Sequence, residues 1–282
     1  MDSSSHNQLD AGIKQIFIDC DHTLVNTQEI SFEAAGTVIN QVLSDQNLPI
    51  RYTYEELLTN HFGFTARQML THLQTKHNFT LTQSQFQTYT TLESNLITTL
   101  LNFHPLPSPN IHTLLTHLTN QNKYNISIVS SSPTLRIHTA LTASNLLPFF
   151  PRSQIISTSS SLPTPASKPN PAIYIHAMSA NNVHPTQCIA IEDSRSGARA
   201  AIRAGVTTVA YVGAYVCELQ RRQVADVLIG EGCVIIDRGF VSPGFPLLLD
   251  AFFLKSLDLF VLQRRLYYDP SFLGASLSHF VL

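Results

Sequence analysis

The feature that most constrains the fold is a series of short apolar runs, most of them in the second half of the chain. The runs are rich in β-branched residues and alternate with helical patterns such as TLRIHTALTASNLL and PAIYIHAMSANN. Strands that alternate with helices of this length predict βαβ crossovers and an open parallel sheet with helices on both faces. The predicted strands cover residues 14–19, 126–130, 154–158, 187–193, 206–212 and 232–237.

The segment of residues 28–104 shows helical patterns and no convincing strand. It follows the first predicted strand and ends near the proline-rich stretch NFHPLPSPN, which is typical of a linker. We therefore expect an all-helical cap domain of residues 28–104. Residues 1–27 and 105–240 would form the α/β core into which this cap is inserted.

Residues 241–282 form a tail that is far more apolar than the chain before it. Charged residues such as Asp250, Lys255 and the Arg264–Arg265 pair interrupt the tail, so it does not predict a membrane span. It is interpreted either as an added amphipathic helix or as a C-terminus that runs past the proper end of the coding sequence. We expect no catalytic residue in it.

The composition indicates an ordinary soluble protein. Hydrophobic residues make up 44% of the chain and charged residues 13%, with a net charge of −2. This balance offers no basic surface for nucleic acid and no polybasic patch for a membrane. The polar N-terminus, MDSSSHNQLDAG, has no apolar secretion signal, so we expect a cytoplasmic location. The four cysteines form no CxxC pair, and neither a disulfide framework nor a zinc site is predicted.

Two aspartates stand where the first predicted strand ends, in the stretch IFIDCDHTLVNT. Asp19 and Asp21 are separated by one residue, and like charges this close disfavour each other's ionisation unless a cation compensates them. Aspartate is also common in turns, so the pair alone leaves a turn and a metal or phosphate site as alternatives. The carboxyl ends of the strands are, however, where open α/β sheets bind ligands.

Three further signals follow other predicted strands. The second strand ends in VSSSP, where Ser130 and Ser131 present hydroxyl groups, although one serine of this run would also cap the next helix. Lys168 stands in SKPNPAIY, just before a helix that prolines begin. The strand IAIED ends in a second acidic pair, Glu192 and Asp193.

Together these residues predict a magnesium site. A carboxylate that attacks a phosphate meets charge repulsion, which a divalent cation and a lysine can cancel. Magnesium prefers oxygen ligands and takes carboxylates together with phosphate and water. The expected ligands are Asp19, the backbone carbonyl of Asp21, Glu192 and Asp193.

The same residues predict phosphoryl transfer. Asp19 would form an aspartyl-phosphate, which splits the reaction into two easier steps. Asp21 would protonate the leaving oxygen and later deprotonate water. Ser130 and Lys168 would bind the transferring phosphoryl oxygens and stabilise their charge.

The four motifs, in this order, resemble the haloacid dehalogenase-like hydrolase superfamily. DCDHTLV matches the pattern DxDxT with Asp19, Asp21 and Thr23, and IVSSS, KPNP and IEDSRSGARAA follow along residues 13–238. The resemblance implies a Rossmann-like core. It is greatest to the beta-phosphoglucomutase and sugar-phosphatase branch with a helical cap, and within it to a group of fungal members. Because Asp21 is present, the resemblance implies phosphoester chemistry rather than cleavage of a carbon–halogen bond.

Two features of the sequence bear on the substrate. His22 stands where the family usually has a small residue or Asn. The stretch NHFGFTARQML lies where related proteins place their substrate loop. The resemblance implies that this loop binds the substrate through His61, Gly63, Thr65 and Arg67. A helix-capping turn, with Thr65 as the cap, is an equally good interpretation.

The sequence therefore predicts a phosphatase that acts on a small phosphorylated sugar or polyol, as a monomer or a dimer. A sugar-phosphate mutase of the same fold is one alternative. Related mutases carry a histidine at the position of Ser31, and a serine hydroxyl cannot relay a proton near neutral pH. A catalytically silent relative that binds a phosphorylated metabolite is the other alternative.

Overall fold

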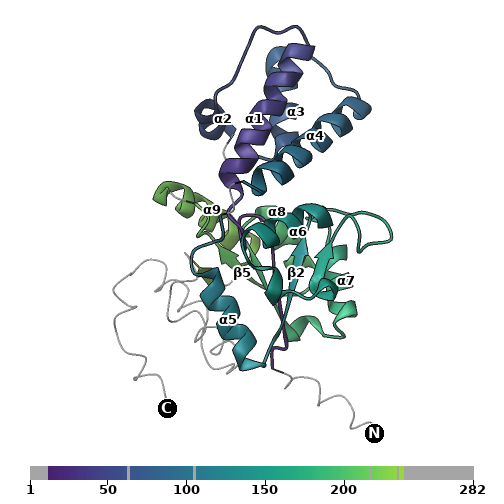
Figure 1. The fold of residues 1–282 in the computed structure, drawn as a ribbon, viewed down its shortest axis with the longest axis vertical. Helices are drawn as coiled ribbons and strands as arrows, with labels where there is room; N and C mark the ends of the chain where they lie inside the picture. Colours follow the sequence, from purple (N-terminus) through teal and green to yellow (C-terminus); the bar gives the residue numbers. More distant parts are fainter. Residues whose placement is uncertain (1–11, 62–63, 104–105, 216, 234, 238–282) are drawn as a thin grey trace. The chain divides into compact units, whose positions relative to one another are not determined.

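The computed structural model describes residues 12–61, 64–103, 106–215, 217–233 and 235–237 (Figure 1). The predicted tail of residues 241–282 and Gly63 lie outside the described residues. The chain divides into two compact units. Among the described residues, the first unit contains those of 12–24, 107–134 and 146–237, and the second contains those of 25–106 and 135–145.

One parallel sheet forms the centre of the first unit (Figure 1). Within the described residues its strands are β1 (Gln15–Ile18), β2 (Asn125–Ser130), β3 (Ile155–Ser157), β4 (Cys188–Glu192), β5 (Thr207–Tyr211) and β6 (Ile235–Asp237). They lie in the order β3-β2-β1-β4-β5-β6, and every neighbouring pair is parallel. Rossmann folds have this order. The predicted α/β fold with a Rossmann-like parallel sheet is confirmed.

The sheet is buried on both faces, as its continuous apolar strands require. In β1, Phe17 points to one face, and Ile16 and Ile18 point to the other; all three side chains are fully buried. Phe17 packs in a cluster with Tyr174 of α7 (Ala172–Ala180) and Ala200 of α8 (Arg195–Arg203). The α-helices described wholly in this unit are α5 (Ile111–Gln121), α7 (Ala172–Ala180), α8 (Arg195–Arg203) and α9 (Glu218–Glu231), and the short 3-10 helices are η1 (Leu147–Phe149), η2 (Arg152–Gln154) and η3 (Pro185–Gln187).

The second unit is helical in its described residues. Its helices are α1 (Gln28–Asp45), α2 (Tyr54–His61), α3 (Ala66–His77) and α4 (Gln83–Leu101), joined by most of α6 (Thr134–Ala143). Apolar side chains spaced for one face of each helix form its core, which includes Val38 and Leu57, with Leu70 and Tyr89. The helical pattern read in residues 28–104 therefore has its own buried core, so packing rather than helix propensity stabilises it.

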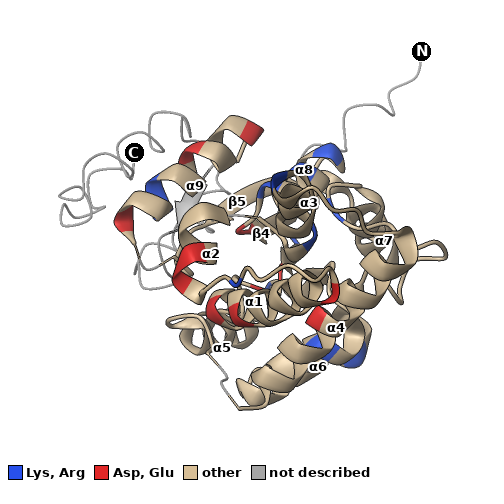
Figure 2. Cartoon of the chain, turned by 90° about the horizontal axis from the view of Figure 1, so that it is seen from above, with Lys and Arg blue, Asp and Glu red and all other residues tan. Residues whose placement is uncertain are grey.

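Charged residues are sparse and dispersed. Figure 2 shows Lys and Arg scattered over several helices of the described part of the chain rather than gathered on one. The first turns of α1 and α2 are acidic, with Glu29 on α1 and with Glu55 and Glu56 on α2. Among the described helices, none is both long enough and apolar enough to cross a membrane.

Candidate active site

The predicted site residues of the first unit lie at the carboxyl edge of the sheet. Asp19 follows β1 directly, and Glu192 ends β4, which pairs with β1. The register places Ile18 beside Ile191, and the backbone N–H of Asp19 donates to the carbonyl of Ile191 at 3.1 Å. β2 pairs with the other side of β1 and ends in Ser130. The strand order reverses between β1 and β4, which is where open α/β sheets bind ligands.

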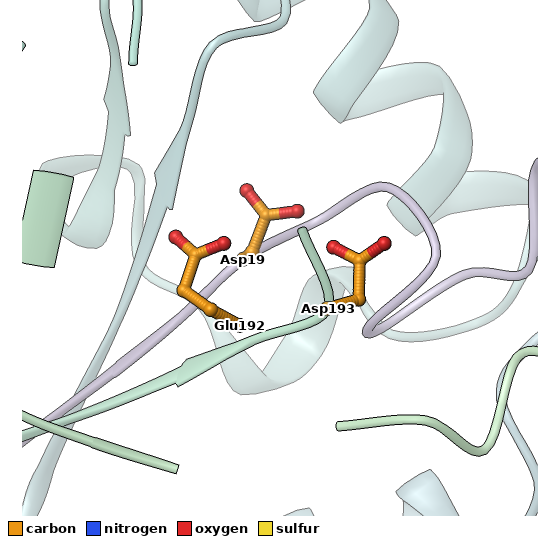
Figure 3. A group of neighbouring side chains, drawn as sticks. All are labelled: Asp19, Glu192 and Asp193. Carbon is orange, nitrogen blue, oxygen red and sulfur yellow. The ribbon is translucent and has the colours of Figure 1, made fainter. Parts of the chain in front are cut away.

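Three carboxylates gather at this point. Asp19, Glu192 and Asp193 each offer an oxygen, and these oxygens lie within 4.8 Å of one another. The three residues are only 7%, 0% and 3% exposed, respectively. Figure 3 shows the carboxyl groups projecting in the same direction from the ends of the two neighbouring strands. Burying negative charges this close together is costly unless cations compensate them.

Lys168 supplies one such cation. Its Nζ lies 2.6 Å from Oδ1 of Asp19 and 2.6 Å from Oε1 of Glu192, and it donates to the carbonyl of Val129 at 2.8 Å. These contacts use all three N–H donors of the ammonium group. The lysine side chain is 4% exposed, so water and salt screen the ion pairs little. The structure thus brings Lys168 to Asp19 across 149 residues of sequence.

The pKa values show that the positive charge of one lysine does not fully compensate the negative charges of the carboxylate cluster. Burial raises the pKa of Asp19 from 3.8 to about 7; Lys168 opposes the shift and Glu192 adds to it. Burial also raises the pKa of Asp193 well above its ordinary value, with further contributions from Asp19 and Glu192. Burial alone would lower the pKa of Lys168, but the carboxylates of Asp19 and Glu192 outweigh burial, and the net shift is upward. The lysine is therefore charged, and the site has a deficit of positive charge.

Hydrogen bonds to one oxygen and close packing at the other fix the Glu192 carboxylate. Its Oε1 accepts hydrogen bonds from Lys168 and from the hydroxyl of the buried Tyr174. A Cβ placed on Gly197 would lie 1.7 Å from Oε2 of Glu192, so the carboxylate occupies the space that a side chain would need. Gly197 therefore leaves the room that the Glu192 carboxylate needs.

Each serine of the VSSSP run makes a different contact. Ser130 is buried, and its Oγ accepts from the backbone N–H of Ser132 at 3.1 Å. The Oγ of Ser131 accepts from the backbone N–H of Lys168 at 3.3 Å. Ser132 donates its hydroxyl to Oδ2 of Asp21. The sequence prediction named Ser130 and Ser131 and missed Ser132, for which the only signal was its place in the run.

Thr23 and His22 belong to the loop after β1. Thr23 is fully buried, and its hydroxyl lies 3.5 Å from Oδ1 of Asp193, so it faces the carboxylate cluster. His22 has a φ of 58°, in the left-handed region. Glycine and Asn adopt this conformation most readily, which gives a backbone reason for the small residue or Asn usual at this position.

His61, a predicted substrate-binding residue, is an interior residue of the second unit. Its side chain is 1% exposed, and its Nε2 lies 2.9 Å from Nδ1 of His72. Burial lowers the pKa of His61, and the neighbouring His72 and Lys76 lower it further. The neutral form is therefore favoured.

The other described residues of the predicted substrate loop also have partners within the second unit. Thr65 is the N-cap of α3: its Oγ1 accepts from the backbone N–H of Gln68 at 3.3 Å, and the Gln68 side chain accepts from the Thr65 N–H at 2.8 Å. The guanidinium of Arg67 lies 5.0 Å from the ring centre of Phe86. The helix-capping interpretation of Thr65 is what the structure shows, while substrate contacts of His61, Gly63, Thr65 and Arg67 stay a prediction.

The carboxylate cluster fits a divalent cation. Carboxylate oxygens from neighbouring strand ends are the ligands that Mg²⁺ and other hard cations prefer. Oε2 of Glu192 is buried and has no hydrogen-bond partner among the described residues. A cation bound among Asp19, Glu192 and Asp193 would supply the positive charge that Lys168 alone cannot.

Known proteins are similar to this chain in sequence and in fold. Residues 16–211 match the family profile described as haloacid dehalogenase-like hydrolase. The 6-phosphogluconate phosphatase of Escherichia coli (strain K12) is 26% identical over 194 residues, which cover 69% of this chain and 80% of the relative.

Two solved structures show the same architecture. A conserved haloacid dehalogenase-like protein from Agrobacterium tumefaciens str. C58 superposes with a TM-score of 0.66 at 23% identity, over 85% of this chain and 99% of that one. The beta-phosphoglucomutase from Clostridium difficile superposes with a TM-score of 0.61 at 17% identity, over 86% of this chain and 98% of that one. At these identities the two structures support the fold alone.

The family profile spans well over half of the chain and contains the strand ends that carry Asp19, Ser130 and Glu192, together with Lys168. The acidic cluster and its lysine thus lie inside the region of family similarity. This chain belongs to the haloacid dehalogenase-like hydrolases, and a phosphatase is among the proteins similar to it in sequence.

Proposed function

We propose that this protein is a magnesium-dependent phosphatase that hydrolyses a small phosphate monoester through an aspartyl-phosphate intermediate. The observation that carries the proposal is the position of Asp19, which contacts Lys168 and lies within the Glu192–Asp193 carboxylate cluster. Asp21 stands two residues further on, with its carboxylate bound by Ser132. The family of the chain and its phosphatase relative support the same reaction.

The first step transfers the phosphoryl group to Asp19. A carboxylate oxygen of Asp19 bonds to phosphorus while the bond from phosphorus to the ester oxygen breaks. Asp21, protonated, gives its proton to that departing oxygen, so an alcohol leaves. Lys168 uses all its donors on protein groups, and it would exchange one of them for a phosphoryl oxygen as negative charge moves from Asp19 to the phosphoryl group.

The second step releases phosphate. Water attacks phosphorus, and Asp21, now a carboxylate, accepts the proton of that water. The bond from phosphorus to Asp19 breaks, which regenerates the Asp19 carboxylate. Ser130 and Ser131 are proposed to orient the phosphoryl oxygens at the end of β2, and Thr23 to orient Asp193.

Magnesium, when bound, supplies positive charge that offsets the carboxylates and the incoming phosphate. Asp19, Glu192, Asp193 and the backbone carbonyl of Asp21 would hold it. The raised pKa values of Asp19 and Asp193 support the need for such a cation, because burial without compensation favours their neutral forms.

The proposed substrate is a small phosphorylated sugar or polyol. The relative from Escherichia coli acts on 6-phosphogluconate by name, and 26% identity supports a related substrate class rather than the same substrate. The helical second unit, as a cap domain, is proposed to select the substrate. The cytoplasm, where such metabolites occur, is the proposed location.

Hydrolysis is proposed in preference to mutase chemistry because of Ser31. This residue lies in the first turn of α1, where its backbone N–H donates to the carbonyl of Thr27 at 2.8 Å. A serine hydroxyl does not titrate near neutral pH, so it cannot act as a proton relay. Nothing then keeps Asp21 from deprotonating water before a sugar hydroxyl reaches the phosphoenzyme. Incubation with β-glucose 1-phosphate is expected to yield inorganic phosphate; preferential formation of glucose 6-phosphate would favour the mutase.

The proposal is tested by turnover of p-nitrophenyl phosphate and a panel of sugar and polyol phosphates with Mg²⁺. The native protein is expected to release phosphate, and Asp19→Asn is expected to abolish turnover because the amide is not a nucleophile. A Glu33→Gln variant, which changes an exposed carboxylate on α1, is the matched control and should retain activity. No turnover by the native protein across the panel would favour the catalytically silent alternative.

A further inference from the structure

Ser132 binds Asp21 across two loops at the carboxyl edge of the sheet. Its hydroxyl donates to Oδ2 of Asp21, although the two residues are 111 positions apart in sequence. One loop follows β1 and the other follows β2, and the two strands are neighbours. The contact therefore depends on the sheet that brings the loops together.

Ser132 is itself fixed at both of its backbone polar groups. Its N–H donates to Oγ of Ser130 at 3.1 Å, and its carbonyl accepts from Oγ of Ser157 at 2.7 Å. Ser130 and Ser157 are only 1% and 0% exposed and end β2 and β3, respectively. Hydrogen bonds from two neighbouring strands thus hold the residue, so little conformational entropy is left for it to lose when it binds a carboxylate.

The chemical nature of Ser132 suits an acid and base better than a nucleophile. A hydroxyl can donate to a carboxylate and can accept from a carboxylic acid, so its contact with Asp21 can persist in both protonation states. Asp19 contacts a lysine instead, and an ammonium group can only donate hydrogen bonds. The two aspartates, two residues apart, therefore have partners that match two different roles.

We propose that Ser132 is a positioning residue that orients the Asp21 carboxyl group for proton transfer, a role that rests on the proposed phosphatase function. In the first step Asp21 delivers its proton to the ester oxygen as the phosphorus–oxygen bond breaks, and its Oδ2 accepts the Ser132 hydroxyl afterwards. In the second step the Asp21 carboxylate takes the proton of the attacking water. The serine hydroxyl keeps its own proton throughout, so it orients the carboxyl group without being consumed.

The experiment compares two leaving groups in Ser132→Ala. Glycerol phosphate releases a basic alkoxide that needs a proton, whereas p-nitrophenyl phosphate releases a stable phenolate that does not. The ratio kcat/KM reports only the steps up to release of the leaving group, so it excludes deprotonation of water. The difference between the two substrates then reports proton donation by Asp21. Ser132→Thr keeps the hydroxyl, and Ser160→Ala removes an exposed serine hydroxyl that contacts Thr134.

Ser132→Ala is expected to lower kcat/KM for glycerol phosphate by about 10- to 100-fold and that for p-nitrophenyl phosphate by less than about threefold. Because deprotonation of water is also impaired, p-nitrophenolate should appear in an initial burst of about one per active site. Ser132→Thr should recover most of the kcat/KM that Ser132→Ala loses for glycerol phosphate. Ser160→Ala should have the same kcat/KM values as the native protein. Melting temperatures confirm that each variant is folded.

Several outcomes would overturn the inference. An equal loss for both substrates would show that Ser132 binds the phosphoryl group or only supports the fold. Failure of Ser132→Thr to recover activity while folded would show that the hydroxyl is not what matters. If the native protein turned over neither substrate, the proposed function would fail first, and the role of Ser132 would fail with it.

Discussion

At the scale of single residues, Gly197 shows how a missing side chain shapes the site. A Cβ at this position would lie 1.7 Å from Oε2 and 2.3 Å from Cδ of Glu192. The Glu192 carboxylate cannot move freely, because Lys168 and Tyr174 both bind its Oε1. We expect Gly197→Ala to reduce the free energy of unfolding by about 1–3 kcal/mol, as overpacking of a rigid interior does. It should also lower phosphatase activity by displacing the carboxylate, and urea unfolding with turnover measurements checks both effects.

Gly230 provides the matched control for this variant. It lies in α9, and a Cβ added there would meet nothing within 4 Å. Since alanine is favoured over glycine within a helix, Gly230→Ala is expected to stabilise the protein by about 0.5–1 kcal/mol without changing activity. If both variants behaved alike, the steric role of Gly197 would be wrong.

At the scale of helices, two capping boxes of the second unit offer a direct comparison. Thr65 caps α3 and Thr82 caps α4, each paired with a glutamine three residues later. In both boxes the threonine Oγ1 accepts from the glutamine backbone N–H, at 3.3 Å for α3 and 3.2 Å for α4. We expect Thr65→Ala and Thr82→Ala each to lower the free energy of unfolding by about 1 kcal/mol. Chemical denaturation of the two variants measures the losses.

The variants Thr65→Ala and Thr82→Ala also distinguish a role of Thr65 in helix capping from a role in substrate binding. The Thr65 hydroxyl also lies 3.0 Å from the Gln68 side-chain oxygen, so its single donor is already used. We therefore expect the KM for sugar phosphates to be unchanged in both variants. A rise in KM for Thr65→Ala alone would instead support the predicted substrate loop of His61, Gly63, Thr65 and Arg67.

At the scale of the whole molecule, the buried carboxylates link metal binding, stability and pH. The pKa of Asp19 is raised to about 7, so the metal-free folded protein keeps a proton that the unfolded chain releases near 3.8. This group's contribution to stability is full below about pH 3.8 and is lost as the pH rises through about 7. Mg²⁺ competes with that proton. The rise in melting temperature caused by Mg²⁺ is therefore expected to be larger at about pH 8 than at about pH 5.5, which calorimetry can measure.

The control is Asp19→Asn, which removes the titrating carboxylate and should reduce both the Mg²⁺ effect and its pH dependence.

Chelation by EDTA should abolish turnover by the native protein. Excess calcium should inhibit it, because calcium favours higher and looser coordination. Full activity in EDTA would contradict the proposed mechanism.

The α/β fold was predictable because its signals are local. The strands are apolar runs buried on both faces, and each of the six described strands overlaps a predicted one. The positions of Asp19, Ser130 and Glu192 at strand ends follow from the same runs. A parallel sheet places such ends on one edge, so the approximate composition of the site could be inferred without coordinates.

The sequence by itself determined the parallel sheet, the edge on which the acidic residues lie, and the identity of Lys168 as their cation. Only the tertiary structure decided the pairings: Ser132 with Asp21, Tyr174 with Glu192, and the Glu192 carboxylate in the space above Gly197. Hydrophobic periodicity reports which face of an element is buried, and it carries no information about which polar atoms meet. Those contacts join residues far apart in sequence, and strand order and register bring them within hydrogen-bonding distance.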